Sequence, residues 1–421
     1  MRIWIIQTGE PIHIDHGKLR PMRAMNLANY LIEAGHKVTL WTSAFNHADK
    51  SNRANEFKKI NYNKSLDILL IPSPGYSGNI GIKRLIDHFF LGLNLRKSLL
   101  KRSEQLPDIA FIGYPPIETS YVAVNFLKKY NIPTILDVKD LWPTLFLEPF
   151  PKILKPIARL IFQPYYYLAK STIKNTYSIC SMSIEYINWV NNFARRKSHN
   201  KNIIAPLSTK LQIITNNELE NARNWWKSFG IVEKSYSRFY FVGNINSSYD
   251  FIPIKKTIEK LNIKKQKFQY IICGQGSEFE KTKHMFNGFD NVIFPGWIDY
   301  PKIKRLGKLS NGAILPYKNI ENFQLNITNK VIDAISLGSP IISTIDGLLN
   351  RFIDENNLGF TCTERSGVDL YEAISLLINN KNLRLKMSQN CLEVYEKLFN
   401  ADNVYQNLVA EMEKIVIKKK S

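Results

Sequence analysis

The sequence has few cysteines and no long apolar run, and each absence excludes a class of protein. The cysteines show no CxxC spacing, so we expect neither a zinc site nor a disulfide framework. No stretch of about 18 uncharged apolar residues occurs, so we expect no helix that spans a bilayer. The apolar opening, Met1–Ile6, stops at a polar loop and is typical of a strand instead of a secretory signal. These features predict a cytoplasmic protein with reduced thiols.

The chain is also short of acidic residues: Lys and Arg number 57 against 36 Asp and Glu, a formal net charge of +21. This excess suits nucleic acid or an anionic membrane surface as a partner, and a lysine-rich composition would also produce it. The basic residues are spread along the chain, and no zinc-finger, RNA-recognition or helix-turn-helix signature occurs. We therefore expect no nucleic-acid partner. A nucleic-acid-binding protein is kept only as the less favoured alternative from a different functional class.

Short apolar strands alternate with amphipathic helices in both halves of the chain, which is typical of α/β proteins with doubly wound parallel sheets. The expected strands are 2–7, 37–42, 67–71, 109–113, 134–138, 178–181 and 202–205, then 238–242, 268–273, 292–295, 312–315, 340–343 and 359–362. The expected helices are 21–34, 82–102 and 118–130, then 251–261, 301–309, 328–337, 368–379 and 382–399. Residues 141–200 are expected to be largely helical.

The length of 421 residues suits two domains of about 100–200 residues each. We predict a first Rossmann-like domain at 1–205 and a second at 206–395, with the linker within 206–235. A C-terminal helix at 396–421 is expected to cross back to the first domain. Ligands of open parallel sheets bind at the carboxyl ends of the strands, so two such sheets are expected to face each other across a cleft.

Two segments of the second half carry candidate chemistry. Gly274 and Gly276 follow a strand, where glycine allows either a tight turn or a close approach of the backbone to a ligand. Thr328 or Asn329 is expected to cap the helix at 328–337, and Lys330 lies in its first turn. A lysine is unfavourable there unless an anion is bound nearby. Asp333 follows on the same face, where it could accept hydrogen bonds from ribose hydroxyls or simply pair with Lys330.

At this point the chain resembles the retaining GT-B glycosyltransferases of family four, the group 1 transferases. The resemblance extends over essentially the whole chain and rests on seven segments in the family's order. Two lie in the first half: Ala34–Leu40, and Leu136–Pro143, which resembles a run in members that transfer amino sugars in surface-polysaccharide synthesis. The others are Val242–Ile245, Ile272–Gly276, Val292–Trp297, Gly312–Tyr317 and Asn326–Ile342.

The resemblance implies that the second domain binds a nucleotide sugar, with UDP favoured, and that the first binds a glycan or polyprenyl-linked acceptor. It implies no cofactor and no metal, and retention of the anomeric configuration. The residues implied to be catalytic are Lys139, Asp140 and Lys330. Those implied for donor binding are Gly17, Gly243, Asn244, Gly274, Gly276, Trp297, Gln324, Asn326, Asn329, Lys330 and Asp333.

The chain departs from the family's pattern at three positions. Leu325 stands where the family's first acid would contact donor-sugar hydroxyls, and Gln324 and Asn326 beside it could replace that contact. Asn244 and Tyr249 stand where the family has an arginine and a lysine. These departures leave open a catalytically degenerate protein that binds sugar nucleotides without turnover. A hexosamine 2-epimerase of the same architecture is a further alternative, which the segment around Lys330 disfavours.

Basic residues in the first half suggest where the acceptor binds and whether the protein contacts a membrane. His16, Lys18 and Arg20 lie in the loop after the first strand and are expected on the acceptor side of the cleft. A metal site at His13–His16 is disfavoured, because the loop spacing does not aim these side chains inward. Residues 81–102 and 150–170 combine basic and large apolar residues, which suits an anionic membrane surface and a lipid-linked acceptor. They could equally be ordinary helices with solvated lysines. We expect a protein peripheral to the inner face of the cytoplasmic membrane.

Overall fold

The structure is a computed structural model that describes residues 1–16, 21–78, 81–102, 105–197, 201–208, 210–233, 236–363 and 369–420. It divides into two compact units, Met1–Ala205 with Val404–Ser421, and Pro206–Asn403. The first boundary follows Ala205, where the sequence analysis also places it. The C-terminal segment joins the first unit from Val404, later than the expected residue 396. None of the described helices is both long and apolar enough to cross a membrane.

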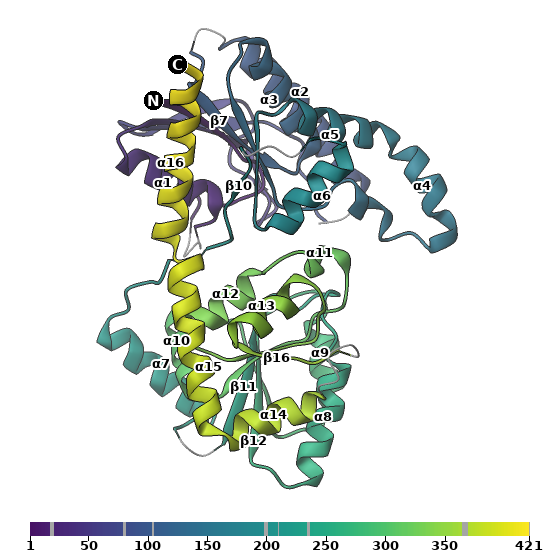
Figure 1. The fold of residues 1–421 in the computed structure, drawn as a ribbon, viewed down its shortest axis with the longest axis vertical. Helices are drawn as coiled ribbons and strands as arrows, with labels where there is room; N and C mark the ends of the chain where they lie inside the picture. The colour runs from purple at the N-terminus through teal and green to yellow at the C-terminus, as the bar shows by residue number, and fades with distance from the viewer. Residues whose placement is uncertain are drawn as a thin grey trace. The chain divides into compact units, whose positions relative to one another are not determined.

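The first unit is built on an eight-stranded sheet with the order β10-β9-β8-β7-β1-β2-β6-β5 (Figure 1). Every pairing in this sheet is parallel except the edge pair β5–β6. Strand order reverses between β1 and β7, so the unit has a switch point there. The strands are β1 Arg2–Ile6, β2 Lys37–Ser43, β5 Lys58–Asn63, β6 Leu66–Ile71, β7 Ile109–Tyr114, β8 Thr134–Val138, β9 Ser178–Ser181 and β10 Ile203–Ile204. A small ribbon pairs β3 Phe45–Asn46 with β4 Ser51–Asn52.

The helices of the first unit are α1 Arg23–Glu33, α2 Ile82–Leu100, α3 Ile117–Lys129, α4 Lys155–Ile161, α5 Gln163–Asn175 and α6 Ile184–Ala194. Short 3-10 turns occur at η1 Thr144–Leu147 and η2 Lys152–Leu154. The C-terminal helix α16, Ala401–Lys420, packs on this unit. The ring of Tyr405 stacks on Tyr30 at 5.3 Å, and Glu413 contacts the His36 ring at 2.9 Å.

The second unit contains a six-stranded, all-parallel sheet with the order β13-β12-β11-β14-β15-β16. Its switch point lies between β11 and β14. The strands are β11 Ser237–Val242, β12 Phe268–Cys273, β13 Val292–Gly296, β14 Gly312–Leu315, β15 Ile341–Ser343 and β16 Gly359–Thr361. The helices are α7 Asn216–Ser228, α8 Ile252–Ile263, α9 Phe279–Met285, α10 Tyr300–Leu309, α11 Glu321–Gln324, α12 Asn329–Ser336, α13 Leu348–Asn356, α14 Leu370–Asn379 and α15 Lys381–Val394, with a π turn at Tyr395–Phe399.

The predicted fold class is confirmed, because each unit is a doubly wound and mainly parallel sheet covered by helices. The predicted linker is wrong over most of its length. Residues 216–228 form α7, which opens with a capping box between Thr215 and Glu218. Its Trp226 is fully buried in the core of the second unit and donates its indole N–H to the Lys302 carbonyl at 2.9 Å. The segment is therefore part of that unit.

Candidate functional site

Three glycines bring backbone segments together at the carboxyl ends of β11 and β12. Gly243, Gly274 and Gly276 have φ angles of 154°, 137° and 149°. Residues other than glycine rarely adopt such angles. A Cβ on Gly274 would collide with the Gly243 carbonyl, and one on Gly276 would collide with the Ile245 carbonyl. The Gly243 N–H donates to the Cys273 carbonyl at 3.0 Å. We call the loops that carry these three glycines the glycine turn. The predicted turn at Gly274 and Gly276 therefore lies beside the switch point of the second unit.

Lys330 lies against this turn. Its Cε occupies the space that a Cβ on Gly243 would need, and its Nζ lies 5.1 Å from the ring centre of Tyr249 and 5.9 Å from that of Phe241. Thr328 is the N-cap residue of α12 by backbone geometry, yet its hydroxyl bonds the Tyr317 hydroxyl and does not cap the helix. The first turn of α12 therefore presents backbone N–H groups without a side-chain cap, next to a lysine ammonium. This combination suits an anion such as a diphosphate.

The other predicted donor residues of α12 and of the segment before it are only partly buried, with one exception. Asn329 and Asp333 are half-buried on α12, and Gln324 donates its amide to Asn319 at 2.7 Å. Asn326 is 9% exposed, and its Oδ1 has no hydrogen-bond partner among the described residues. Burying an amide oxygen without a partner is costly, and a ligand group that donates to it would remove the cost.

Two further residues predicted to bind the donor, Asn244 and Trp297, have fewer described contacts at this site. Asn244 follows Gly243 at the end of β11, and its Oδ1 lies where a Cβ on Gly276 would point. Trp297 follows β13 at the same edge of the sheet and is 63% exposed. The structure gives Asn244 a place in the glycine turn.

The first unit has a cavity of about 190 Å³ at its own switch point, at the carboxyl ends of β1, β2, β7 and β8. Lys139 and Asp140, which follow β8, line this cavity as a pair of predicted catalytic residues. Their neighbours in the wall include polar side chains that the sequence analysis did not single out: Glu10, His47, Tyr76, Arg84, Asp87 and His88.

Lys139 belongs to a buried set of alternating charges. Its ammonium contacts the Glu10 carboxylate and lies 3.4 Å from Asp137, which in turn lies 3.3 Å from the Arg23 guanidinium. Glu10 also accepts the Ala24 N–H at the start of α1. Burial opposes the charge of Lys139, but the Glu10 and Asp137 carboxylates raise its pKa overall. Lys139 is therefore held cationic and in a fixed place at the cavity floor.

Two neutral imidazoles form another part of the wall. His47 Nδ1 lies 2.6 Å from the Tyr76 hydroxyl and 3.2 Å from Lys50 Nζ, which can only donate, so its proton resides on Nε2. His88 is 4% exposed, and its Nδ1 has no partner among the described residues. Burial, then nearby cations, lowers the pKa of His47 to about 4 and that of His88 to about 3. Neutral imidazoles can both donate to and accept from hydroxyl groups, which suits a sugar.

These histidines were missed because they come from separate parts of the chain. His47 follows the β3 strand, Tyr76 lies in the loop before α2, and His88 is on the inner face of α2. A sequence signal exists for His88. Arg84, His88 and Leu91 are spaced four and three residues apart, so they share one face of α2, but the many basic residues of this segment favoured a membrane-facing interpretation instead.

The predicted acceptor loop after β1 is only partly described. Gly17, Lys18 and Arg20 lie outside the described residues. His16 is exposed and is not among the residues that line the cavity. Asp15 forms a two-bond ion pair with Arg53 at 2.5 and 2.6 Å, and His13 bonds Asn29 at 2.9 Å. In the part of the chain that the structure describes, no group of three or more His, Cys, Asp or Glu could hold a metal ion.

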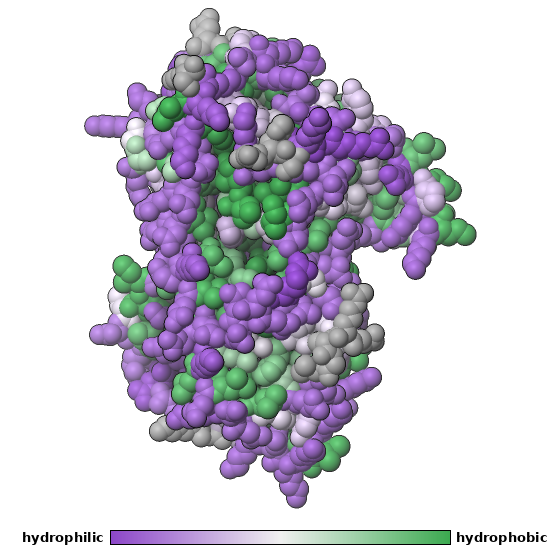
Figure 2. Space-filling model, viewed as in Figure 1, coloured by the Kyte–Doolittle hydropathy of each residue, from purple (hydrophilic) through white to green (hydrophobic). Residues whose placement is uncertain are grey.

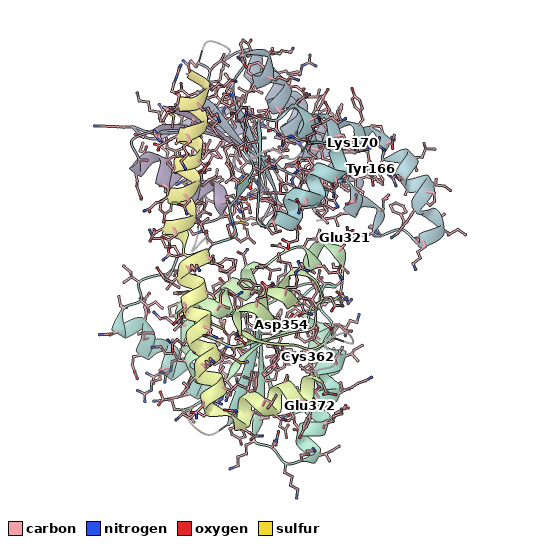
Figure 3. The ribbon with its side chains drawn as sticks, viewed as in Figure 1. Tyr166, Lys170, Glu321, Asp354, Cys362 and Glu372 are labelled. Atoms are coloured by element: carbon pink, nitrogen blue, oxygen red, sulfur yellow. The ribbon has the colours of Figure 1, made fainter. Side chains whose placement is uncertain are left out.

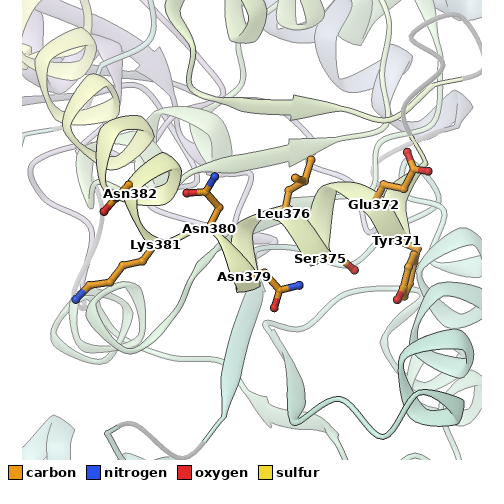
Figure 4. A pocket seen from close by; sticks show the side chains of 8 residues that line it. All are labelled: Tyr371, Glu372, Ser375, Leu376, Asn379, Asn380, Lys381 and Asn382. Atoms are coloured by element: carbon orange, nitrogen blue, oxygen red, sulfur yellow. The ribbon is translucent and has the colours of Figure 1, made fainter.

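A larger hollow of about 650 Å³ lies elsewhere on the second unit, along α14 and the start of α15 (Figure 4). Its wall consists of Tyr371, Glu372, Ser375, Leu376 and Asn379–Asn382. None of the predicted donor residues lines it. We therefore assign the chemistry to the glycine turn and Lys330, in spite of the larger volume of this hollow.

Solved structures similar to this chain include glycosyltransferases of the GT-B fold. The chain is similar to sucrose-phosphate synthase from Thermosynechococcus elongatus, with a TM-score of 0.72, 14% identity and 99% of each chain covered. It is similar to Anabaena HepE in complex with UDP, with a TM-score of 0.64, 10% identity, and 98% of this chain and 99% of that chain covered. It is also similar to WaaG, a glycosyltransferase involved in lipopolysaccharide biosynthesis, with a TM-score of 0.63, 13% identity, and 97% and 98% covered. At these identities the likeness establishes the fold.

One family model matches part of the chain. Residues 226–393 match the family model described as glycosyl transferases group 1. The match lies within the second unit, and there it confirms the predicted resemblance to group 1 glycosyltransferases. The matched residues include the glycine turn, Lys330 and Asp333. No curated protein matches the chain.

Proposed function

We propose that the protein is a retaining glycosyltransferase that moves a sugar from a nucleotide diphosphate donor to an acceptor. The donor would bind the second unit at the glycine turn, and the acceptor would bind the cavity of the first unit. The observation that carries this proposal is the packing of Lys330 against Gly243, beside the uncapped first turn of α12, within the segment that matches group 1 glycosyltransferases.

The chemistry follows from where charge develops. The difficult step is departure of the nucleoside diphosphate, because negative charge builds on its oxygens. The Lys330 ammonium and the N–H groups of α12 are held in place before the reaction and would stabilise that charge, so a metal ion is not required in this proposal. Asp333, one turn further along α12, is assigned to the ribose hydroxyls. Asn326 is assigned to the donor sugar, because its buried Oδ1 could accept a sugar hydroxyl.

On the acceptor side, Asp140 and Lys139 are assigned to the floor beside the reacting carbon. Lys139 is fixed by Glu10 and Asp137 and would orient the acceptor by its charge. His47 and His88 would recognise acceptor hydroxyls, since each carries a neutral imidazole in the wall of the cavity.

The donor and pathway proposed are a UDP-linked N-acetylated hexosamine and the synthesis of a bacterial surface polysaccharide on a polyprenyl-linked acceptor. The Asp137–Pro143 run, typical of amino-sugar transferases, supports the sugar class. The complex of HepE with UDP supports the nucleotide, and WaaG supports the pathway class. We also propose that the protein works at the inner face of the cytoplasmic membrane.

The test is a thermal-shift panel with UDP, GDP, ADP and CMP, without added metal, on the wild type and on Lys330→Ala. A ligand that binds only the folded state raises its melting temperature. We expect UDP to stabilise the wild type selectively and the variant not at all. Turnover of UDP-N-acetylglucosamine with an acceptor then separates the transferase from a degenerate binder, and conversion without acceptor would indicate an epimerase. No shift with any nucleotide would overturn the proposal.

A further inference from the structure

The first unit carries a continuous segment of exposed aliphatic residues, η2 with α4, which we name the docking segment (residues 152–161). In Figure 1 this segment extends away from the sheet of its unit, and Figure 2 shows hydrophobic side chains gathered at its outer end. Ile153, Leu160 and Ile161 are 84%, 76% and 68% exposed. Leu154 and Ile157 are also exposed. Single exposed aliphatic residues are ordinary, but a contiguous group of them marks a contact surface.

The aliphatic residues alternate with cations. Lys152, Lys155 and Arg159 lie within the docking segment, and Lys170 and Lys174 follow on α5. Figure 3 labels Lys170 and Tyr166 on α5, next to α4. Residues 149–184 contain no Asp or Glu. The surface therefore combines apolar side chains and positive charge without acidic side chains of its own.

A chain of ring contacts connects the docking segment to the acceptor cavity. The His88 ring in the cavity wall lies 5.7 Å from Trp142, which lies 4.6 Å from Phe146. Phe146 in turn lies 5.2 Å from Phe162, the residue that ends α4. Aromatic rings at these separations are in packing contact. The carboxyl end of the docking segment therefore packs, through Phe162, Phe146 and Trp142, against the wall of the cavity.

Helix α2 also connects the cavity to an exposed apolar surface. Arg84, Asp87 and His88 line the cavity from its inner face. Its outer face exposes Ile86, Phe89 and Phe90, of which Phe89 is 53% exposed. One wall of the cavity thus carries exposed apolar side chains on its other side.

We propose that the docking segment inserts its aliphatic side chains into the surface of an anionic lipid bilayer, with its lysines and arginine at the level of the headgroups. Aliphatic side chains favour the boundary of the acyl chains, and each cation gains from the negative surface potential. A second copy of the chain is disfavoured as the occupant, because it would bring two cationic surfaces into contact. If the proposed function holds, this packing brings the acceptor cavity close to the membrane, which suits an amphiphilic, lipid-borne acceptor.

The experiment is sedimentation of the full chain with vesicles of equal parts phosphatidylcholine and phosphatidylglycerol, and with vesicles of phosphatidylcholine alone. The variant I153S/L160S changes two strongly exposed side chains. The control I213S/I263S changes two aliphatic residues of the second unit that are at least as exposed, 100% and 81%. We expect the wild type and the control to sediment with the anionic vesicles. We expect the variant's partition coefficient to fall at least about ten-fold, because aliphatic burial is lost.

The result has clear alternatives. Wild-type protein that stays in the supernatant with anionic vesicles at low salt overturns the proposal, as does a variant that sediments like the wild type. Size-exclusion chromatography with light scattering tests the other occupant: a wild-type dimer that I153S/L160S dissociates would assign the surface to a second copy instead. Nucleotide stabilisation and turnover need no vesicles, so docking without turnover would overturn the proposed function and leave the docking surface intact.

Discussion

Lys330 fills the space that a side chain on Gly243 would occupy, although 87 residues of sequence separate the two positions. The Lys330 Cε and the missing Cβ of Gly243 cannot both be present. Behind the lysine lie the rings of Phe241 and Tyr249. The family resemblance predicts a lysine at position 249, and the Tyr249 ring that stands there instead lies against Lys330. The position of the lysine therefore depends on the glycine. We expect a change at either residue to weaken nucleotide binding.

Gly243→Ala is expected to displace Lys330 and weaken nucleotide binding by about ten-fold or more, equivalent to about 1.4 kcal/mol. The cause is twofold: the Cβ collides with the lysine, and the backbone at φ 154° disfavours any side chain. Isothermal titration with UDP measures the effect. Gly230→Ala is the control, because it also has a positive φ, 70°, but open space around it. Equal losses of affinity in both variants would mean that backbone strain alone is responsible.

Lys330→Met is expected to lower the affinity for UDP by about ten- to a hundred-fold, since hydrogen bonds to charged groups are worth about 1.5–3 kcal/mol. The melting temperature without ligand should change little, because the methionine keeps most of the apolar stem against Tyr249 and Phe241. The matched control is Lys256→Met, an exposed lysine of α8 in the same unit. The assignment would be wrong if both variants bound UDP like the wild type.

Asn326→Leu separates a ligand-binding role from a structural one. The substitution removes a buried amide oxygen that has no partner among the described residues, which should stabilise the ligand-free second unit by about 1–3 kcal/mol. The same change should weaken binding of a UDP-sugar about ten-fold while UDP alone binds unchanged. Differential scanning calorimetry and titration measure the two effects, with Asn287→Leu as the exposed control. A variant that is less stable and binds the UDP-sugar normally would assign Asn326 to structure.

Some elements could be predicted to the residue, and the reason is local. Strands β8, β9, β12 and β14 are short runs of apolar residues between clear breaks, and their predicted and observed bounds agree. Strand β5, Lys58–Asn63, was missed because it is an antiparallel edge strand that is mostly polar and largely exposed to solvent. Helix α7 was mistaken for a linker because its surface is polar, although Thr215 and Glu218 signalled a helix start.

The candidate sites divide in the same way. That the glycines and Lys330 lie together could be anticipated, because they fall in segments with a local spacing that the second unit preserves, whereas their role in donor binding stays a prediction. The wall of the acceptor cavity could not, because His47, Tyr76 and His88 meet only after β2, β6 and α2 have packed. Lys139 was predicted as a residue near the reacting carbon, but its pairing with Glu10 depends on contact between residues far apart in the sequence.

The pH dependence of stability offers a test of the acceptor cavity. The folded protein keeps His88 neutral down to a pKa of about 3, whereas the exposed imidazole of the unfolded chain titrates at its ordinary value of 6.5. Between these values the unfolded state binds the extra proton, so stability falls as pH decreases and is fully present above the ordinary value. His47, with a pKa of about 4, contributes in the same direction. Glu118 opposes them, because burial raises its pKa to about 7 and its contribution is lost as pH rises.

Because these groups oppose one another, the measurement that isolates His88 is the difference between the wild type and His88→Phe, which keeps an aromatic ring against Trp142. We expect the wild type to lose more melting temperature than the variant when the pH falls from about 7.5 to about 5. His16→Phe is the control, because it makes the same substitution at an exposed position of the same unit. If His88→Phe follows the wild-type profile, the folded state does not keep the imidazole neutral, and its buried place in the cavity wall is wrong.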